Sequence, residues 1–254
     1  MTIRPCRLKR RASAKMLICA CLVFFLAAFA GCSGKGISPQ IKEYIGKAAE
    51  AGKEITSYRM TLAMYLDGEQ WGRIKTDELT TDINGSDLAL KEVFYNPQTD
   101  QSMVVQEVVR VGDKQYSKNI QNQQWEEEEP TPIEEKAATY TSHIGDFLTY
   151  SSAADLLAEE EVNGVTAHHM RFQLSARNVA DLLPSTPQSS LDTNQGGQAD
   201  IWLDTTTYYP VKYELLFRNV MVGQEFGYAN VIIVIDIKDI NQPIRISLPA
   251  GVQS

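Results

Sequence analysis

Cysteine and histidine are scarce in this sequence, and the cysteines are confined to its N-terminal end. The four cysteines are Cys6, Cys19, Cys21 and Cys32. The rest of the chain therefore has no thiol with which to form a disulfide or attack a substrate. The three histidines are His143, His168 and His169. A Gly-x-Ser-x-Gly motif, a phosphate-binding glycine loop and a zinc motif are all missing, so the common catalytic signatures are excluded.

Basic residues are also few once the N-terminal segment is set aside. The whole chain has 24 basic and 32 acidic residues, for a net charge of −8. Residues 1–15 hold six of the basic residues and no acid, so without them the net charge is −14. This balance excludes nucleic acid as a partner, because binding it requires a basic face. The acidic run Glu126–Glu129 is expected to be a solvated loop, since like charges repel and stay exposed.

The N-terminal segment has the features of an export signal. Residues 1–15 are basic, and Met16–Ala30 is an uncharged apolar run of 15 residues. A transmembrane helix needs roughly 20 such residues, so a membrane span is the less favoured alternative. The pair Ala30-Gly31 before Cys32 resembles the lipobox of bacterial lipoproteins, although Phe29 stands where leucine is usual. We expect cleavage between Gly31 and Cys32, and a diacylglyceryl group on Cys32 that anchors the chain extracytoplasmically to the cell membrane.

This assignment divides the chain into three parts. Residues 1–31 are the removed signal peptide, residues 32–36 are the lipidated cysteine and a tether, and residues 37–254 are a single domain. The 223 residues that remain after cleavage are enough for one sizeable core.

The hydrophobic period changes from helical to strand-like near Thr56. Ser38 and Pro39 suit the start of a helix, and apolar residues recur at helical spacing as far as Ile55. A second helix is predicted from Ile144 to Glu161, a helical turn at 178–183 and a polar loop at 184–198. Strands separated by short turns are predicted to be antiparallel neighbours. They are expected at 59–66, 71–83, 88–95, 103–111, 114–120, 165–175, 199–204, 211–222, 227–239 and 244–248.

The fold class predicted from these elements is α+β, with a single strongly curved antiparallel sheet of about ten strands covered by two or three helices. A sheet with one apolar face must cover that face. Two or three helices cover only part of the apolar face of about ten strands. Either the side chains fill the space between sheet and helices, or a ligand cavity remains there. Both alternatives stay open from proportions alone.

Several segments, taken in order, resemble the LppX–LprAFG family of bacterial lipoproteins, and more loosely the LolA-type carriers. They are Lys114 to Trp125, Glu161-Val-Asn-Gly-Val-Thr-Ala-His-His169, Ala199 to Asp204, Tyr209 to Lys212 and Asp239 to Pro249. Asp113-Lys114 departs from the family pattern, in which glycine commonly follows the aspartate. The resemblance implies a LolA-like half-open β-barrel over an apolar cavity. It also implies binding and transport of lipid or lipoglycan acyl chains within the cell envelope, without a cofactor.

Residues lining this cavity are inferred from strand alternation. Val211, Tyr213, Leu215 and Phe217 are expected to share one face, and methionines would adapt the pocket to varied lipids. The predicted lining residues are Met60, Leu62, Met64, Met103, Val105, Phe147, Leu148, Met170, Phe172, Leu174, Ile201, Val211, Tyr213, Leu215, Phe217, Ile233 and Ile235.

No catalytic or metal-binding residue is predicted, and the chain is expected not to be an enzyme. His168 and His169 are adjacent on a predicted strand, so their side chains point to opposite faces and do not share a metal. Asp200 and Asp204 face one way with Trp202, where exposed acids are commoner than catalytic ones. One alternative is an envelope sensor or scaffold that binds a protein partner, such as a transporter or acceptor, through the same fold. Another is a hydrolase, which a cluster of histidine and carboxylates would support.

Overall fold

The computed structural model describes residues 36–69, 71–96, 99, 101–130, 144–176, 195–223, 227–250 and 252. Gly36–Ser254 is a compact unit by itself, separate from Met1–Lys35. The predicted signal peptide and Cys32 lie outside the described residues. So do His143, the predicted turn at 178–183 and most of the loop 184–198.

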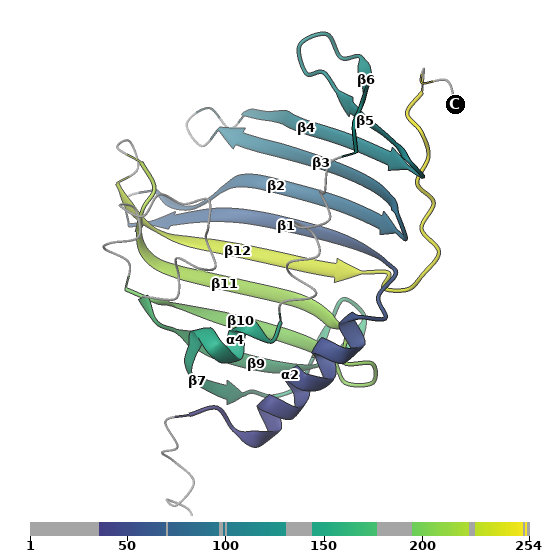
Figure 1. Cartoon of the computed structure of the whole chain (residues 1–254). Helices are drawn as coiled ribbons and strands as arrows, with labels where there is room; N and C mark the ends of the chain where they lie inside the picture. The colour runs from purple at the N-terminus through teal and green to yellow at the C-terminus, as the bar shows by residue number, and fades with distance from the viewer. Residues whose placement is uncertain are drawn as a thin grey trace, which may run out of the picture. The chain divides into compact units, whose positions relative to one another are not determined.

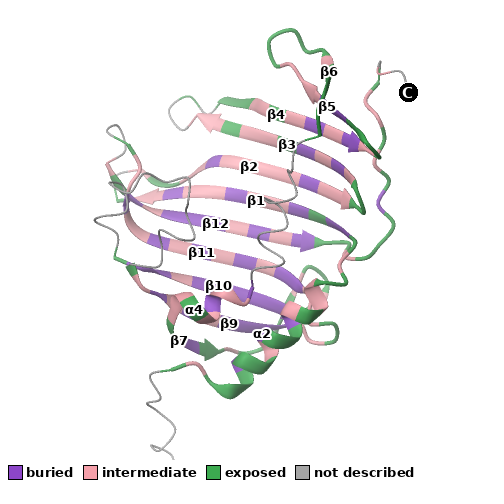
Figure 2. Ribbon diagram, viewed as in Figure 1, coloured by how far each residue is buried: buried purple, intermediate pink, exposed green. Residues whose placement is uncertain are grey.

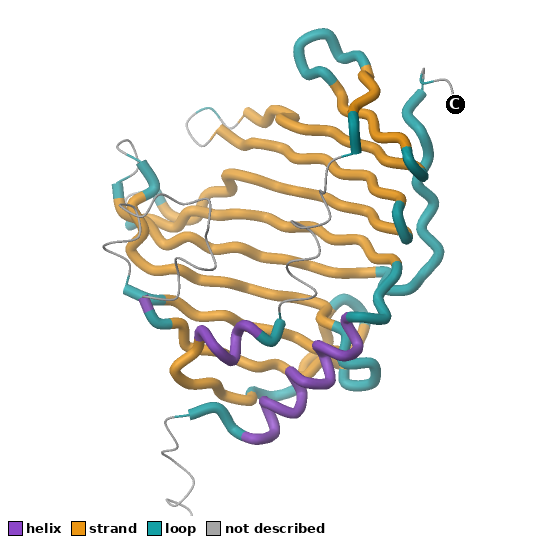
Figure 3. The backbone as a smooth tube through the Cα atoms, viewed as in Figure 1, coloured by secondary structure: helices purple, strands orange, loops and turns teal. Residues whose placement is uncertain are grey.

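One antiparallel sheet of twelve strands organises the described residues (Figures 1 and 3). The strand order is β6-β5-β4-β3-β2-β1-β12-β11-β10-β9-β7, and β8 pairs with β9. The two ends of this order do not pair with each other, so the curved sheet stays open. The strands are β1 (Ser57–Gly68), β2 (Gly72–Asn84), β3 (Asp87–Asn96), β4 (Gln101–Val111), β5 (Lys114–Lys118), β6 (Trp125–Glu128), β7 (Ser151–Leu156), β8 (Glu160–Val162), β9 (Val165–Leu174), β10 (Gly197–Asp204), β11 (Pro210–Met221) and β12 (Tyr228–Lys238).

The first and last strands of the chain join two meanders at the middle of the sheet. β1 to β6 follow one another outward on one side, and β12 back to β9 follow on the other. β1 and β12 pair in antiparallel register, with Leu62 opposite Ile235 and Met64 opposite Ile233. This long-range pairing places the apolar residues of both meanders on one continuous face.

Two helices, α2 (Pro39–Gly52) and α4 (Asp146–Tyr150), lie on the same side of the sheet, over its β7–β11 part (Figure 1). We call this side the inner face and the opposite side the outer face. The predicted start of α2 is confirmed: the Ser38 hydroxyl accepts a hydrogen bond from the Ile41 amide at 3.3 Å, and Pro39 occupies the first turn. The buried stripe of α2 is Ile41, Ile45 and Ala48.

The main core lies between these helices and the inner face, as the buried segments of β9–β12 show in Figure 2. Its largest fully buried side chains include Phe172, Tyr213 and Phe217. Burying one aromatic side chain of this size contributes about 2–3 kcal/mol to folding. Phe147 of α4 packs against Phe172 and Tyr213, with ring centroids 6.2 and 6.1 Å apart. These contacts hold α4 on the sheet.

The predicted helix from Ile144 to Glu161 is wrong beyond Tyr150. Ser151–Leu156 and Glu160–Val162 are strands β7 and β8 instead. Both pair with β9, which brings Ala154 opposite Phe172. Cross-strand pairing and packing outweigh the weak helical period of this segment.

Two further predictions are corrected. The acidic run begins inside strand β6, paired with β5, and its carboxylates stay exposed to solvent. Residues 244–248 are not a strand. The C-terminal segment runs along the ends of the strands (Figure 1). It is held there because the Ser57 hydroxyl donates to the Gln242 carbonyl at 2.8 Å and the Asn84 amide to the Ile244 carbonyl at 3.0 Å.

Candidate functional site

The inner face is apolar in consecutive rows across the middle strands. Tyr213 pairs with Ile235, Leu215 with Ile233 and Phe217 with Val231. All belong to one buried cluster that also contains Ile237. The prediction that Tyr213, Leu215 and Phe217 share a face is confirmed.

The same face continues onto β1 and β2, where its side chains are less buried. Ile235 is opposite Leu62, which is opposite Leu79 in turn. Leu62, Met64, Ile74 and Leu79 are partly buried and pack against the margin of the main cluster. Figure 1 places α2 and α4 over the other half of the sheet. Among the described helices, therefore, none lies over this part of the inner face.

A second apolar cluster extends the inner face to β3 and β4. Leu88, Leu90 and Val108 are buried there, and Leu79 and Ile83 pack against both clusters. The sequence prediction missed this group, because β2 and β3 are rich in threonine and charged residues. Alternation within β2 would have identified Leu79 and Ile83, because residues four apart on a strand point to the same face of the sheet.

A few polar groups interrupt this apolar surface. Asp77 is opposite Met64 on one side and Phe94 on the other. Burial raises the pKa of the Asp77 carboxyl, and a hydrogen bond with Thr76 opposes this. Within the described part of the chain, the buried hydroxyls of Thr81 and Tyr213 lack a hydrogen-bond partner. Leaving such a group unpaired costs about 1–3 kcal/mol, which a bound acceptor would recover.

Most predicted lining residues lie in or against the main cluster, but three do not. Those in the cluster are Met60, Phe147, Met170, Phe172, Leu174, Ile201, Tyr213, Leu215, Phe217, Ile233 and Ile235, with Leu62, Met64 and Leu148 at its margin. Met103 and Val105 lie on β4, outside both clusters, and Met103 is 56% exposed.

Val211 was predicted on the face of Tyr213, and the structure corrects this. Trp202 pairs with Lys212 and Leu203 with Pro210, so Val211 is the extra residue of a β-bulge. A bulge breaks strand alternation locally. Val211 accordingly packs with Ala167 and Trp202 in a separate cluster.

The outer face carries a buried polar cluster around Asp200, which is 5% exposed. One oxygen of Asp200 lies 2.7 Å from Nε2 of His169 and 2.8 Å from Nε of Arg171. Nδ1 of His169 lies 2.9 Å from a Glu160 oxygen, which also accepts from the Trp202 indole at 2.6 Å. Each ring nitrogen of His169 thus faces a carboxylate. This geometry is that of a structural cluster.

The two adjacent histidines lie on opposite faces, as predicted. His168 stacks on Tyr44 of α2 and His169 stacks on Trp202, each with ring centroids 4.3 Å apart. Within the described residues there is no group of three or more histidine, cysteine or acidic side chains that could hold a metal ion.

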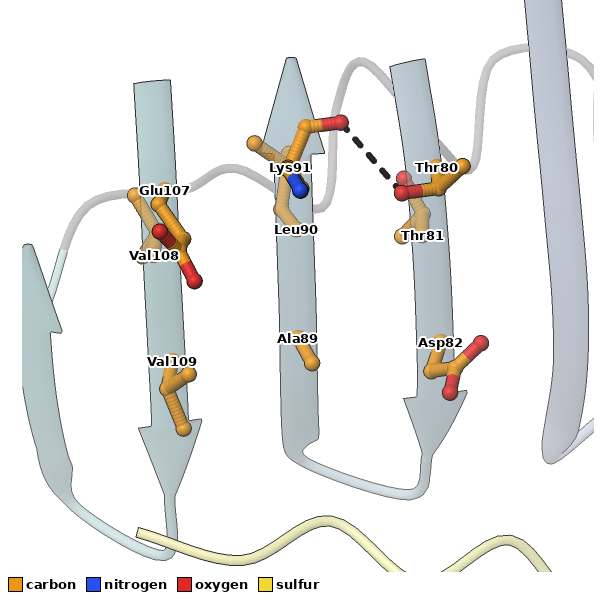
Figure 4. Close-up of a pocket in the computed structure, with 9 residues that line it drawn as sticks. All are labelled: Thr80, Thr81, Asp82, Ala89, Leu90, Lys91, Glu107, Val108 and Val109. Atoms are coloured by element: carbon orange, nitrogen blue, oxygen red, sulfur yellow. Dashed lines mark hydrogen bonds between the residues drawn. The ribbon is translucent and has the colours of Figure 1, made fainter. Parts of the chain in front are cut away.

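A hollow of about 170 Å³ lies over β2, β3 and β4 (Figure 4). The Thr80 hydroxyl donates to the Lys91 carbonyl at its rim, at 3.4 Å. Charged side chains make this hollow unsuited to an acyl chain. It is lined by Thr80, Thr81, Asp82, Ala89, Leu90, Lys91, Glu107, Val108 and Val109.

Comparison with known proteins identifies the fold but no close relative. No family model and no curated protein matches the sequence. The lipoprotein LppX of Mycobacterium tuberculosis is 15% identical with a TM-score of 0.51, over 83% of this chain and 100% of LppX. LprF from Mycobacterium bovis is 14% identical with a TM-score of 0.49, over 86% of this chain and 100% of LprF.

The likeness to LppX spans 83% of this chain and is one of fold. In the part of the chain that the structure describes, no helix combines the length and apolar character needed to cross a membrane.

The chain has the fold of LppX, an open antiparallel sheet with helices on one face. This confirms, at the level of the fold, the family resemblance predicted from its sequence motifs.

Proposed function

We propose that this protein binds the acyl chains of a lipid or lipoglycan on its inner face and carries them within the cell envelope. The observation that carries the proposal is the apolar continuity of this face from β12 to β4. Each methylene removed from water contributes about 0.8 kcal/mol, so a lipid crosses an aqueous layer only when its chains are buried. Leu62, Met64 and Leu79 offer partly buried apolar surface for this purpose.

The polar groups of the inner face fit an esterified lipid. The unpaired hydroxyl of Thr81 is a donor, and an ester or glycosidic oxygen is an acceptor. The flexible side chain of Met64 would adapt to acyl chains of different shape. No reaction is part of the proposal, because the histidine–carboxylate cluster lies on the other face and has no free ring nitrogen.

The proposal includes a lipid anchor on Cys32 and an extracytoplasmic location. It is supported by the basic, apolar and small-residue pattern before Cys32. Intact-mass measurement of the full-length product extracted from bacterial membranes is expected to show a chain that begins at Cys32 and carries a diacylglyceryl adduct. An uncut, unmodified mass would contradict the anchor and leave the lipid-binding domain to be tested separately.

Leu62→Glu is expected to reduce lipid binding by about tenfold, equivalent to about 1.4 kcal/mol. The new carboxylate would lie between Leu79 and Ile235, where an acyl chain would have to desolvate it. Residues 36–254 would be purified from a bacterium without detergent, and bound lipid measured by native mass spectrometry and solvent extraction.

Thr80→Glu is the matched control, because Thr80 lies on the outer face beside Leu79, opposite Lys91. It adds the same charge to the same sheet without touching the inner face. Thermal unfolding of both variants confirms that they are folded. Wild-type protein that neither co-purifies with lipid nor takes lipid from added phospholipid vesicles would refute the carrier function and favour the sensor or scaffold alternative.

A further inference from the structure

The β4 edge of the sheet is longer than the strand that covers it. β4 extends from Gln101 to Val111, but β5 pairs with it only between Val108 and Val111. Among the described residues, no strand pairs with Gln101–Glu107 on that side. Figure 1 shows β5 and β6 rising away from the sheet beyond the paired part. One half of β4 therefore presents backbone donors and acceptors without a neighbouring strand.

The chemistry of this open half is unusual for a sheet edge. Gln101–Gln106 contains three apolar residues and no charged one. Its first three residues are exposed, whereas the half paired with β5 contains the buried Val108 and Arg110 (Figure 2). Proteins normally protect an edge with charges, prolines or bulges. Within the described residues, the protection here is a bulge at Val105 and one charged residue at the end of the open half, Glu107, which is paired with Lys118.

A hollow of about 190 Å³ lies beside the open edge. It exceeds the about 150 Å³ of a cavity that holds a benzene molecule, so it has room for a small apolar side chain. Glu107 and Lys118 pair across part of its wall at 3.1 Å, which neutralises their charges. Met103, which is 56% exposed, and Ile120, which is 39% exposed, supply apolar surface. The lining residues are Met103, Val104, Glu107, Lys118, Ile120 and Gln123.

The charge beside the edge favours a basic partner. Strand β6 carries Glu126, Glu127 and Glu128, all exposed. A second copy of the chain would bring the same acidic strand to this edge, and like charges would oppose its approach. An extended peptide with a basic end would have the opposite charge.

We propose that the open edge of β4 binds an extended peptide segment of a partner protein by strand addition. The peptide backbone pairs with Gln101–Gln106, an apolar side chain enters the hollow, and a basic flank faces β6. Strand addition derives affinity from main-chain hydrogen bonds and specificity from pockets for alternate side chains, and this edge provides both. The site lies outside the inner-face clusters and does not depend on lipid binding.

Hydrogen exchange on residues 36–254 tests the proposal directly. The probe is a synthetic pool of peptides Lys-Thr-Val-x-Val-Thr-Lys, in which x is valine, leucine, phenylalanine or threonine. At least one apolar member is expected to protect the amides of Gln101–Gln106. Met103→Lys is expected to weaken that binding by about tenfold, because it places a charge at the mouth of the hollow.

Tyr228→Lys is the matched control, since Tyr228 is 53% exposed but lies on β12 in the middle of the sheet. It should bind the peptide as the wild type does, and so should Leu62→Glu. The proposal fails if no peptide of the pool protects this edge, or if Met103→Lys binds equally well. It also fails if glutamate-flanked peptides bind as tightly, or if sedimentation shows that the edge pairs with a second copy instead.

Discussion

Phe217→Glu is expected to unfold the domain and not merely to empty a lipid site. Phe217 is 0% exposed, is opposite Val231 on β12, and lies in the main cluster under the helices. An unpaired carboxylate at such a position costs several kcal/mol, a large fraction of the about 5–15 kcal/mol that stabilises a typical domain. Circular dichroism and urea unfolding of residues 36–254 measure the loss.

The backbone around Phe217 leaves it little room to move. Gly197 is its partner on β10, and a Cβ at that glycine would lie 2.3 Å from the Leu216 carbonyl oxygen. The two strands thus approach closely at this pair.

Leu216→Glu is the matched control for this prediction. Leu216 is half-buried, lies on the outer face, and is opposite Gln198, so its replacement should leave a folded domain. A Phe217→Glu variant that stayed as stable as the wild type while losing lipid would mean that Phe217 lines an accessible cavity. That result would show that the space between β11 and the helices is an open cavity and not a filled core.

The elements that could be predicted from the sequence are those set by neighbouring residues. The start of α2 depends on Ser38 and Pro39, and the inner face of β12 depends on alternation alone. The strands β7 and β8 depend instead on pairing with β9. The spacing of apolar residues within these two segments does not indicate that pairing. The bulge at Val211 likewise arises from the register of β10 and β11, so no local pattern marks it.

For the candidate site, the sequence predicted which face of the sheet each side chain lies on, but not how deeply the side chain is buried. Met60, Met64 and Met103 all come from strand positions predicted to line a cavity. Met60 is 2% exposed and packed into the core, Met64 is partly buried at its margin, and Met103 is 56% exposed at the edge of β4. Alternation assigns a side, whereas burial depends on which segments cover each strand. The mismatch in length between β4 and β5 that exposes Met103 has no sequence signal of its own.

Asp200→Asn is expected to lower the free energy of unfolding by about 3 kcal/mol, at the lower end of the range for breaking a buried charged pair. The neutral amide fits the space but no longer supplies the charge that His169 and Arg171 share. The lower end applies because the Arg171 side chain is 39% exposed and water replaces part of its interaction. Urea unfolding of residues 36–254 at neutral pH measures the change.

Asp236→Asn is the control for this cluster. Asp236 lies on β12, and one of its oxygens accepts a hydrogen bond from the Asn163 amide at 3.4 Å, a weaker contact. Its replacement should change the free energy of unfolding by about 0.5 kcal/mol or less. Lipid retention by folded Asp200→Asn should equal that of the wild type, because the cluster lies on the face opposite the inner face, where we propose that acyl chains bind. Loss of lipid without loss of stability would contradict this separation and would place the histidine–carboxylate cluster in the functional site.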